Sequence, residues 1–193
     1  MSSFGDVALG RAGTAAPDLD AIFGLVSAAG VLAALTGFVP TGLGSVCFRT
    51  VDGGVFGAFA QVQRDLRRLV AAEPDATAEH STDAYGCGWV LTRHPPGALE
   101  RVVNDLHVVN ATFEAGGFGP YLLCSLTGFA RPDGRRLALV YTHVAGTFYP
   151  FAPAAGGGRD AALEDQAREA IGADLPFERD RARWFPLWDA PAI

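Results

Sequence analysis

Thiols and imidazoles are the side chains of this sequence that could form a nucleophilic pair. The 193 residues contain three cysteines and four histidines. A cysteine attacks a substrate as its thiolate, and a neighbouring imidazole or helix N-terminus is needed to lower the thiol pKa. A small thiol-dependent hydrolase would combine Cys87 or Cys124 with His80 or His143.

The settings of the cysteines favour a structural role over catalysis. All three lie inside apolar segments, where a free cysteine usually behaves as a small hydrophobic residue. Cys87 departs most from this pattern, because Asp83 and Tyr85 precede it on a glycine-lined strand. We therefore predict a non-enzymatic chain and keep the hydrolase as the alternative. An odd cysteine count without CxxC spacing favours a reducing cytoplasmic compartment.

Motifs for metals, cofactors and nucleotides are missing from the sequence. It has no HxxxH, HExxH or paired CxxC spacing and neither GxGxxG nor GxxxxGK[ST], so we expect no metal and no cofactor. The net charge of −6 opposes binding to nucleic acid and to anionic lipid. Glycine and proline interrupt the longest apolar stretches, which we interpret as too broken to span a bilayer. Membrane contact is expected to be indirect only.

Two apolar runs near the C-terminus predict a β-hairpin. Residues 121–129 and 137–143 flank Arg131-Pro132-Asp133-Gly134, a turn signal with a fixed-φ proline and a glycine that tolerates positive φ. A third run, 147–151, contains Pro150 and is expected at a sheet edge or end.

Apolar periodicity upstream predicts helices separated by strands. The expected helices span about 17–37, 55–70, 98–115 and 160–171, and the expected strands span 45–51 and 84–93. Residues 36–44 are predicted to be a loop and residues 73–83 to be irregular. The order predicts an α+β single domain with a mixed or mostly antiparallel sheet of about five strands, including a C-terminal hairpin, covered by three to four helices.

Composition divides the chain into three parts. We predict a flexible N-terminus at 1–16, an α+β core domain at 17–153, and a C-terminal helix and aromatic tail at 154–193 that packs on the core. A pocket between the sheet and helix 98–115 would suit a small-molecule-sensing domain, which stays a further alternative.

Aromatic residues gathered in the last third are candidates for partner binding, because aromatic side chains beside arginine often anchor interfaces. The candidates are Trp184, Phe185, Trp188, Tyr149 and Phe151. The other interpretation is that the tail folds back onto the sheet and closes its core. Small residues at Gly86, Gly88 and Gly128 suggest that a partner helix could lie along the strands.

Long co-linear blocks resemble a known family. They read LDAIFGLVSAA, TGFVPTGLGSVCF, STDAYGCGWVLTR, DLHVVNATFEAGGFGPYLLCSLTGF, GRRLALVYTHVAGTFYPFAP and ARWFPLW. From about residue 17 to residue 188 the chain resembles the PspAB family of PspA-associated proteins. The resemblance supplies no catalytic residues.

The resemblance implies an accessory component of the phage-shock envelope-stress system. Its expected partner is a PspA-like coiled-coil protein that remodels membranes, with an HtpX-like membrane protease as a second partner. An adaptor of this kind would act by protein–protein interaction, in the cytoplasm or at the inner face of the membrane through its partner. The oligomeric state is left open.

Overall fold

A six-stranded antiparallel sheet forms the centre of the computed structural model, which describes residues 18–50, 60, 64 and 77–193. The strand order is β2-β3-β1-β4-β5-β6. The strands are β1 Val39–Arg49, β2 Thr77–Thr82, β3 Cys87–Arg93, β4 Leu122–Ala130, β5 Arg136–Thr142 and β6 Thr147–Phe151. The α+β prediction is confirmed, and so is the hairpin, which pairs β4 with β5.

The sheet has six strands rather than about five because β2 lies in a segment predicted to be irregular. Five of its six residues are exposed, and among the described strands it pairs with β3 alone, at the edge of the sheet. Polar and charged residues are typical of exposed edges, where they discourage pairing with other chains. The predicted helix at 55–70 lies outside the described residues except for Ala60 and Arg64, and the predicted N-terminal segment 1–16 lies wholly outside them.

Strand β1 begins earlier than predicted, at Val39 instead of residue 45. Its pairing with β4 shifts register between Pro40 and Gly44, and such a bulge accommodates proline and glycine inside a strand. Gly42 has φ +82°, and a Cβ there would lie 2.2 Å from the carbonyl oxygen of His94. The glycines and proline that suggested a loop therefore form a bulged strand.

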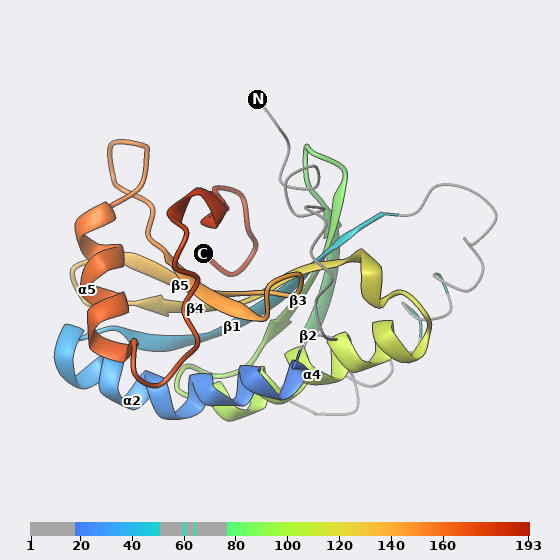
Figure 1. Cartoon of the computed structure of the whole chain (residues 1–193), viewed down its shortest axis with the longest axis horizontal. Helices are drawn as coiled ribbons and strands as arrows, with labels where there is room; N and C mark the ends of the chain where they lie inside the picture. The colour runs from blue at the N-terminus through green and yellow to red at the C-terminus, as the bar shows by residue number, and fades with distance from the viewer. Residues whose placement is uncertain (1–17, 51–59, 61–63, 65–76) are drawn as a thin grey trace.

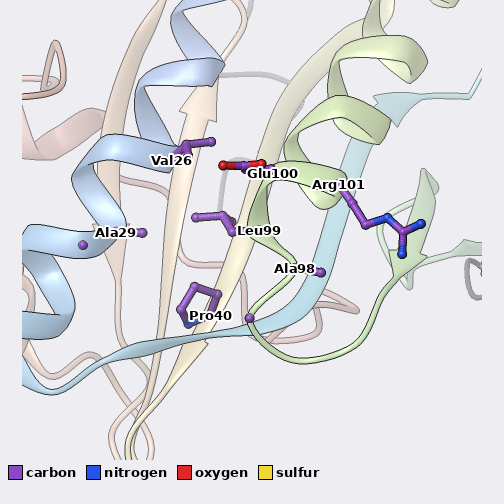
Figure 2. A pocket seen from close by; sticks show the side chains of 9 residues that line it. Val26, Ala29, Pro40, Ala98, Leu99, Glu100 and Arg101 are labelled. Atoms are coloured by element: carbon purple, nitrogen blue, oxygen red, sulfur yellow. The ribbon is translucent and has the colours of Figure 1, made fainter.

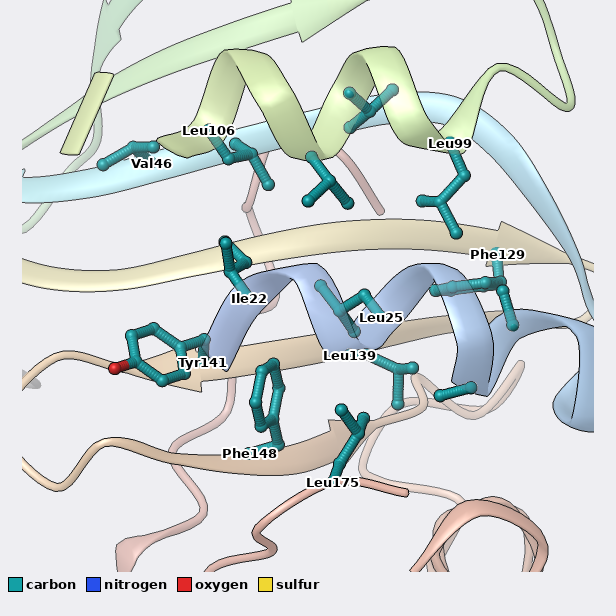
Figure 3. Packing of buried hydrophobic residues seen from close by; sticks show 14 of the residues in the cluster. Ile22, Leu25, Val46, Leu99, Leu106, Phe129, Leu139, Tyr141, Phe148 and Leu175 are labelled. Atoms are coloured by element: carbon teal, nitrogen blue, oxygen red, sulfur yellow. The ribbon is translucent and has the colours of Figure 1, made fainter. Parts of the chain in front are cut away.

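Helices cover one face of the sheet (Figure 1). A 3-10 turn, η1 Leu19–Phe23, runs directly into α2 Gly24–Thr36; α4 Leu99–Ala115 lies beside it, and α5 Ala161–Ile171 packs against α2. Two more 3-10 turns are η2 Gly119–Tyr121 and η3 Arg181–Arg183. Figure 3 shows Leu99 and Leu106 of α4 and Leu25 of α2 meeting above the strands.

Close approach of α4 to β1 depends on Gly44. A Cβ at this position would lie 2.4 Å from Val102 Cγ1 and 3.3 Å from both Leu106 methyl carbons. The space between the sheet and α4, where a sensing pocket was predicted, is filled here by Val102, Leu106, Val109 and Phe113, each with no exposed surface. A ligand beneath residues 102–113 of α4 would have to displace packed side chains.

The C-terminal segment covers the opposite face of the sheet, as Figure 1 shows. Trp184, Leu187, Ala190 and Ala192 join strand residues in a second buried cluster. A Cβ at Gly128 would lie 2.2 Å from the carbonyl oxygen of Ala192, and a Cβ at Gly88 would lie 2.3 Å from the Phe48 ring. The room predicted for a partner helix is therefore occupied by the tail at Gly128 and by the helix-side core residue Phe48 at Gly88, whereas a Cβ at Gly86 would meet no atom within 4 Å.

Candidate interaction surface

The outer side of α2 carries no charged group. Between Asp20 and Arg49 the sequence contains no Asp, Glu, Lys, Arg or His. The inner side buries Ile22 of η1 together with Leu25, Ala28 and Leu32. Solvent-facing sides of helices in soluble proteins normally carry polar and charged residues. The outer side of α2 lacks the charged side chains that usually make such a surface soluble.

What we call the α2 stripe comprises Phe23, the last residue of η1, and Ser27, Val31 and Leu35 of α2, at successive i, i+4 positions. Residues at this spacing lie on one helix face. One side of the Phe23 ring packs on His107 of α4, with ring centroids 5.0 Å apart. The side chains of Phe23, Val31 and Leu35 are 39%, 37% and 64% exposed, and Val39 just beyond the helix is 52% exposed. In the described part of the chain, these are four of the eight large hydrophobic residues that are exposed. Apolar patches of this kind mark interaction sites on soluble proteins.

The helix that carries the stripe is continuous through its glycines. Leu19–Thr36 is long and apolar enough to cross a membrane by length and composition alone, and 28% of it is buried inside the protein. The prediction that glycine breaks this stretch is wrong, because Gly24 and Gly30 both lie within the helical segment. A core helix passes the same test, but most of this one is not buried.

A groove of about 400 Å³ adjoins the α2 stripe (Figure 2). Its lining comprises Val26, Ala29, Gly30, Pro40, Gly97, Ala98, Leu99, Glu100 and Arg101. The floor is apolar, and one acidic and one basic side chain stand at the end where α4 begins. In Figure 2 the Arg101 side chain extends away from α2. The groove can therefore accept an apolar group and offers a charge of either sign at its rim.

The loop before α4 is fixed by hydrogen bonds. The His94 backbone N–H donates to the Gly42 carbonyl at 2.9 Å, and His94 Nε2 lies 2.7 Å from Asp105 Oδ2. Gly97 has φ +88°, a conformation that L side chains rarely adopt. These constraints fix the loop that leads to Ala98 and Leu99, two of the lining residues, so this wall of the groove is pre-formed.

The predicted Cys–His pairs are not brought together. Side chains alternate across a strand, so Cys124 and Ser125 point to opposite faces of the sheet. Cys87 and Cys124 belong to the buried cluster on the tail side. His143 contacts Ser125, which bonds to α4 on the helix side. His80 likewise lies against Phe48 of the helix-side core, with ring centroids 5.7 Å apart.

His143 instead belongs to a buried polar cluster with Ser125 and Asn110. Asn110 Nδ2 donates to Ser125 Oγ at 3.0 Å, and Ser125 Oγ lies 3.0 Å from His143 Nε2. None of the three exposes more than 4% of its surface, so a substrate cannot reach the hydroxyl. An asparagine on the apolar side of helix 98–115 was the one sequence signal of this cluster, which ties α4 to β4 and β5.

Burial lowers the pKa of His143 from 6.5 to about 3. Between these values the unfolded chain binds a proton that the folded chain does not, so stability falls as pH drops below 6.5. We expect acidification to pH 5.5 to cost about 1.4 kcal/mol at this site. Urea unfolding of the wild type and of His143→Gln at pH 7.5 and 5.5 measures this change in the free energy of unfolding. An equal loss of unfolding free energy in both proteins between the two pH values would show that His143 does not cause the pH dependence.

The aromatic candidates differ in accessibility. Tyr149 and Phe151 have no exposed surface and Trp184 is 5% exposed, whereas Trp188 is 47% exposed. Phe185 is half-buried. Tyr149 stacks on Trp184 with ring centroids 6.2 Å apart, and Phe151 meets Trp188 edge to face at 5.1 Å. In this structure Trp188 and Phe185 are the candidates that a partner could touch.

Comparison with known proteins finds one family. The family model for PspAB, described as PspA associated protein B, matches residues 1–192. No curated protein and no solved structure was found to match the chain.

Proposed function

Because the chain belongs to the PspAB family, PspA associated protein B, we propose that it is a non-enzymatic adaptor that binds a PspA-type protein through the α2 stripe and its groove. Association with PspA is implied by the family's name. The finer proposal is that the docked element is the apolar face of a helix from the PspA-type partner. We further propose that the adaptor acts in the cytoplasm or at the inner face of the membrane, as an accessory of the envelope-stress response.

The observation that supports this proposal most strongly is the uncharged, exposed side of α2. Helix-in-groove recognition uses apolar anchors spaced at i, i+3 or i+4, and i+7. Val31 and Leu35 stand at i and i+4, and Phe23 lies eight residues before Val31 with Ser27 between them. The neighbouring groove of about 400 Å³ has room for a side chain from the partner. A partner helix with apolar residues on one face would cover the stripe.

The rim of the groove supports a preferred orientation for that helix. Glu100 and Arg101 are both exposed at the start of α4, at one end of the groove. Charged residues at an interface rim contribute more to register and association rate than to affinity. An HtpX-like membrane protease remains a predicted second partner, with no surface assigned to it.

The test compares two aspartate substitutions at valines of similar exposure. Val31 on the α2 stripe is 37% exposed, and Val144 in the β5–β6 turn is 40% exposed. We expect Val31→Asp to weaken binding to the purified PspA-type protein by about tenfold or more, which corresponds to about 1.4 kcal/mol. Val144→Asp should leave the dissociation constant within about twofold, as surface changes usually do. Isothermal titration calorimetry measures both.

Three outcomes would contradict the proposal. One is equal affinity of Val31→Asp and the wild type for the PspA-type protein, with both folded by circular dichroism. Another is a self-associating chain whose dimer is broken by Val31→Asp while partner binding is unchanged, which would assign the stripe to a second copy. The last is binding to phospholipid vesicles without partner, lost in Val31→Asp, which would assign the stripe to the membrane.

A further inference from the structure

The three cysteines gather on one face of the sheet. Cys47 on β1 is paired directly with Cys124 on β4, and its cross-strand partner on β3 is Trp89, two residues from Cys87. Residues two apart on a strand share a face, so all three thiols point to the tail side. There they belong to one buried cluster. The chain therefore holds three reduced thiols next to one another.

The central position of Cys47 follows from the strand order β3-β1-β4. Its thiol interacts with the thiols of both Cys124 and Cys87. Thiol–disulfide exchange proceeds by attack of one sulfur on a second while a third departs. A middle sulfur with one neighbour on each side has the arrangement that this reaction needs.

Strand pairing also places Cys47 and Cys124 at bridging distance. Directly opposed residues of antiparallel strands have Cα atoms about 4.5 to 5.5 Å apart. A disulfide spans Cα separations of about 4.4 to 6.8 Å. A Cys47–Cys124 bond therefore requires no movement of the strands.

Cys87 is the thiol nearest to solvent. It is 8% exposed, against 1% for Cys47 and none for Cys124. The hydrogen bond from Cys47 lowers the pKa of Cys87, and Arg49 acts in the same direction, while burial and the Asp83 carboxylate oppose them. Burial raises the pKa of Cys47, so Cys47 remains the protonated donor of this pair. Reactivity toward oxidants follows thiolate character and access, and both single out Cys87.

We propose that these three thiols form an oxidisable site for hydroperoxides, in which Cys87 reacts first and the disulfide finally joins Cys47 to Cys124. The Cys87 thiolate attacks the outer oxygen of the hydroperoxide, the O–O bond breaks, and an alcohol or water leaves with the thiol proton. The product is a Cys87 sulfenic acid. Sulfur loses two electrons, and the peroxide gains them.

Two exchanges complete the sequence. Cys47 Sγ attacks Cys87 Sγ, the S–O bond breaks, and hydroxide leaves as water with the Cys47 proton. Cys124 Sγ then attacks Cys47 Sγ, the Cys47–Cys87 bond breaks, and Cys87 departs as a thiolate that takes up the Cys124 proton. The sum is one hydroperoxide and two thiols converted to one alcohol or water, one water and one disulfide.

The test treats the reduced full-length chain with hydrogen peroxide. Samples are quenched with N-ethylmaleimide over time and mapped by non-reducing mass spectrometry. We expect two of the three thiols to be lost and a Cys47–Cys124 peptide to accumulate after a transient Cys47–Cys87 peptide. Cys87→Ser should slow this disulfide by about tenfold or more, because the accessible thiolate is gone. Cys124→Ser should stop the sequence at Cys47–Cys87.

The wild-type time course tests the proposal even if a variant fails to fold. Three thiols that still react with N-ethylmaleimide after unfolding would overturn the proposal, provided that free cysteine is oxidised under the same conditions. Disulfides between chains, or a Cys47–Cys124 bond that forms equally fast in folded Cys87→Ser, would also overturn it.

Discussion

Replacing Trp184 with alanine is expected to destabilise the fold by about 3 to 5 kcal/mol, the cost of removing a large buried aromatic side chain. Trp184 is 5% exposed, its Nε1–H donates to the Glu178 carbonyl at 3.0 Å, and its ring stacks on Tyr149. Natural domains have a free energy of unfolding of only about 5 to 15 kcal/mol. Loss of this one side chain should therefore lower the urea midpoint strongly.

Trp188 provides the matched control. It is the same residue type four positions later, but it is 47% exposed. We expect Trp188→Ala to cost about 1 kcal/mol or less, since surface substitutions have small effects. Equal destabilisation by the two substitutions would contradict the account of the tail as a cover for the second core. It would mean that residues 184–193 do not pack as described.

Replacing Glu164 with alanine is expected to cost about 2 to 3 kcal/mol, because the buried carboxylate loses its charge-assisted hydrogen bonds and the partly exposed Arg159 loses its counter-ion. Glu164 is 2% exposed and accepts from Arg159 Nε at 2.8 Å and from the Ala152 backbone N–H at 3.0 Å. Arg159 also donates to the carbonyl oxygens of Pro150 and Trp184. The pair joins β6, α5 and the tail.

Asp165 is the matched control for Glu164. It follows directly on α5, and its carboxylate pairs with Arg181 and Arg168 at a partly exposed site. Exposed ion pairs contribute about 0 to 1 kcal/mol, so Asp165→Ala should change the free energy of unfolding by no more than that. Chemical denaturation of both variants measures the difference. A Glu164→Ala protein as stable as Asp165→Ala would show that the buried pair is dispensable.

Elements with strong side-chain periodicity could be predicted from the sequence. The predicted helix 98–115 corresponds to α4 Leu99–Ala115, and the predicted hairpin is β4 paired with β5. In the helix the core-facing apolar residues recur every three or four positions, and in the hairpin strands they recur about every second position. Strand β2 was missed because an exposed edge strand buries no such set.

The interaction surface was missed for a different reason. Apolar periodicity predicts a helix at 17–37, but it does not separate the buried side of this helix from the side that carries Val31 and Leu35, because both sides are apolar. The available signal was the absence of any charged residue between Asp20 and Arg49. Apolar residues all around a helix indicate a second buried side, whether in a core, a membrane or a complex.

Contacts between side chains that depend on the strand order or on the path of the tail could not be predicted from the sequence. The clustering of Cys47, Cys87 and Cys124 requires β1 to lie between β3 and β4. The contrast between Trp184 and Trp188 requires knowledge of how the tail crosses the sheet. Both depend on contacts between distant segments, which local patterns do not encode.

Docking of a PspA-type helix on the α2 stripe can be detected by photo-crosslinking from within the stripe. A benzoylphenylalanine at Leu35, which is 64% exposed, is compared with one at the exposed Gln166 on α5. We expect the probe at position 35 to crosslink to an apolar helix face of the PspA-type protein and the probe at position 166 not to do so. Crosslinks from position 166 alone, or from neither position while the complex stays intact, would contradict docking on the stripe.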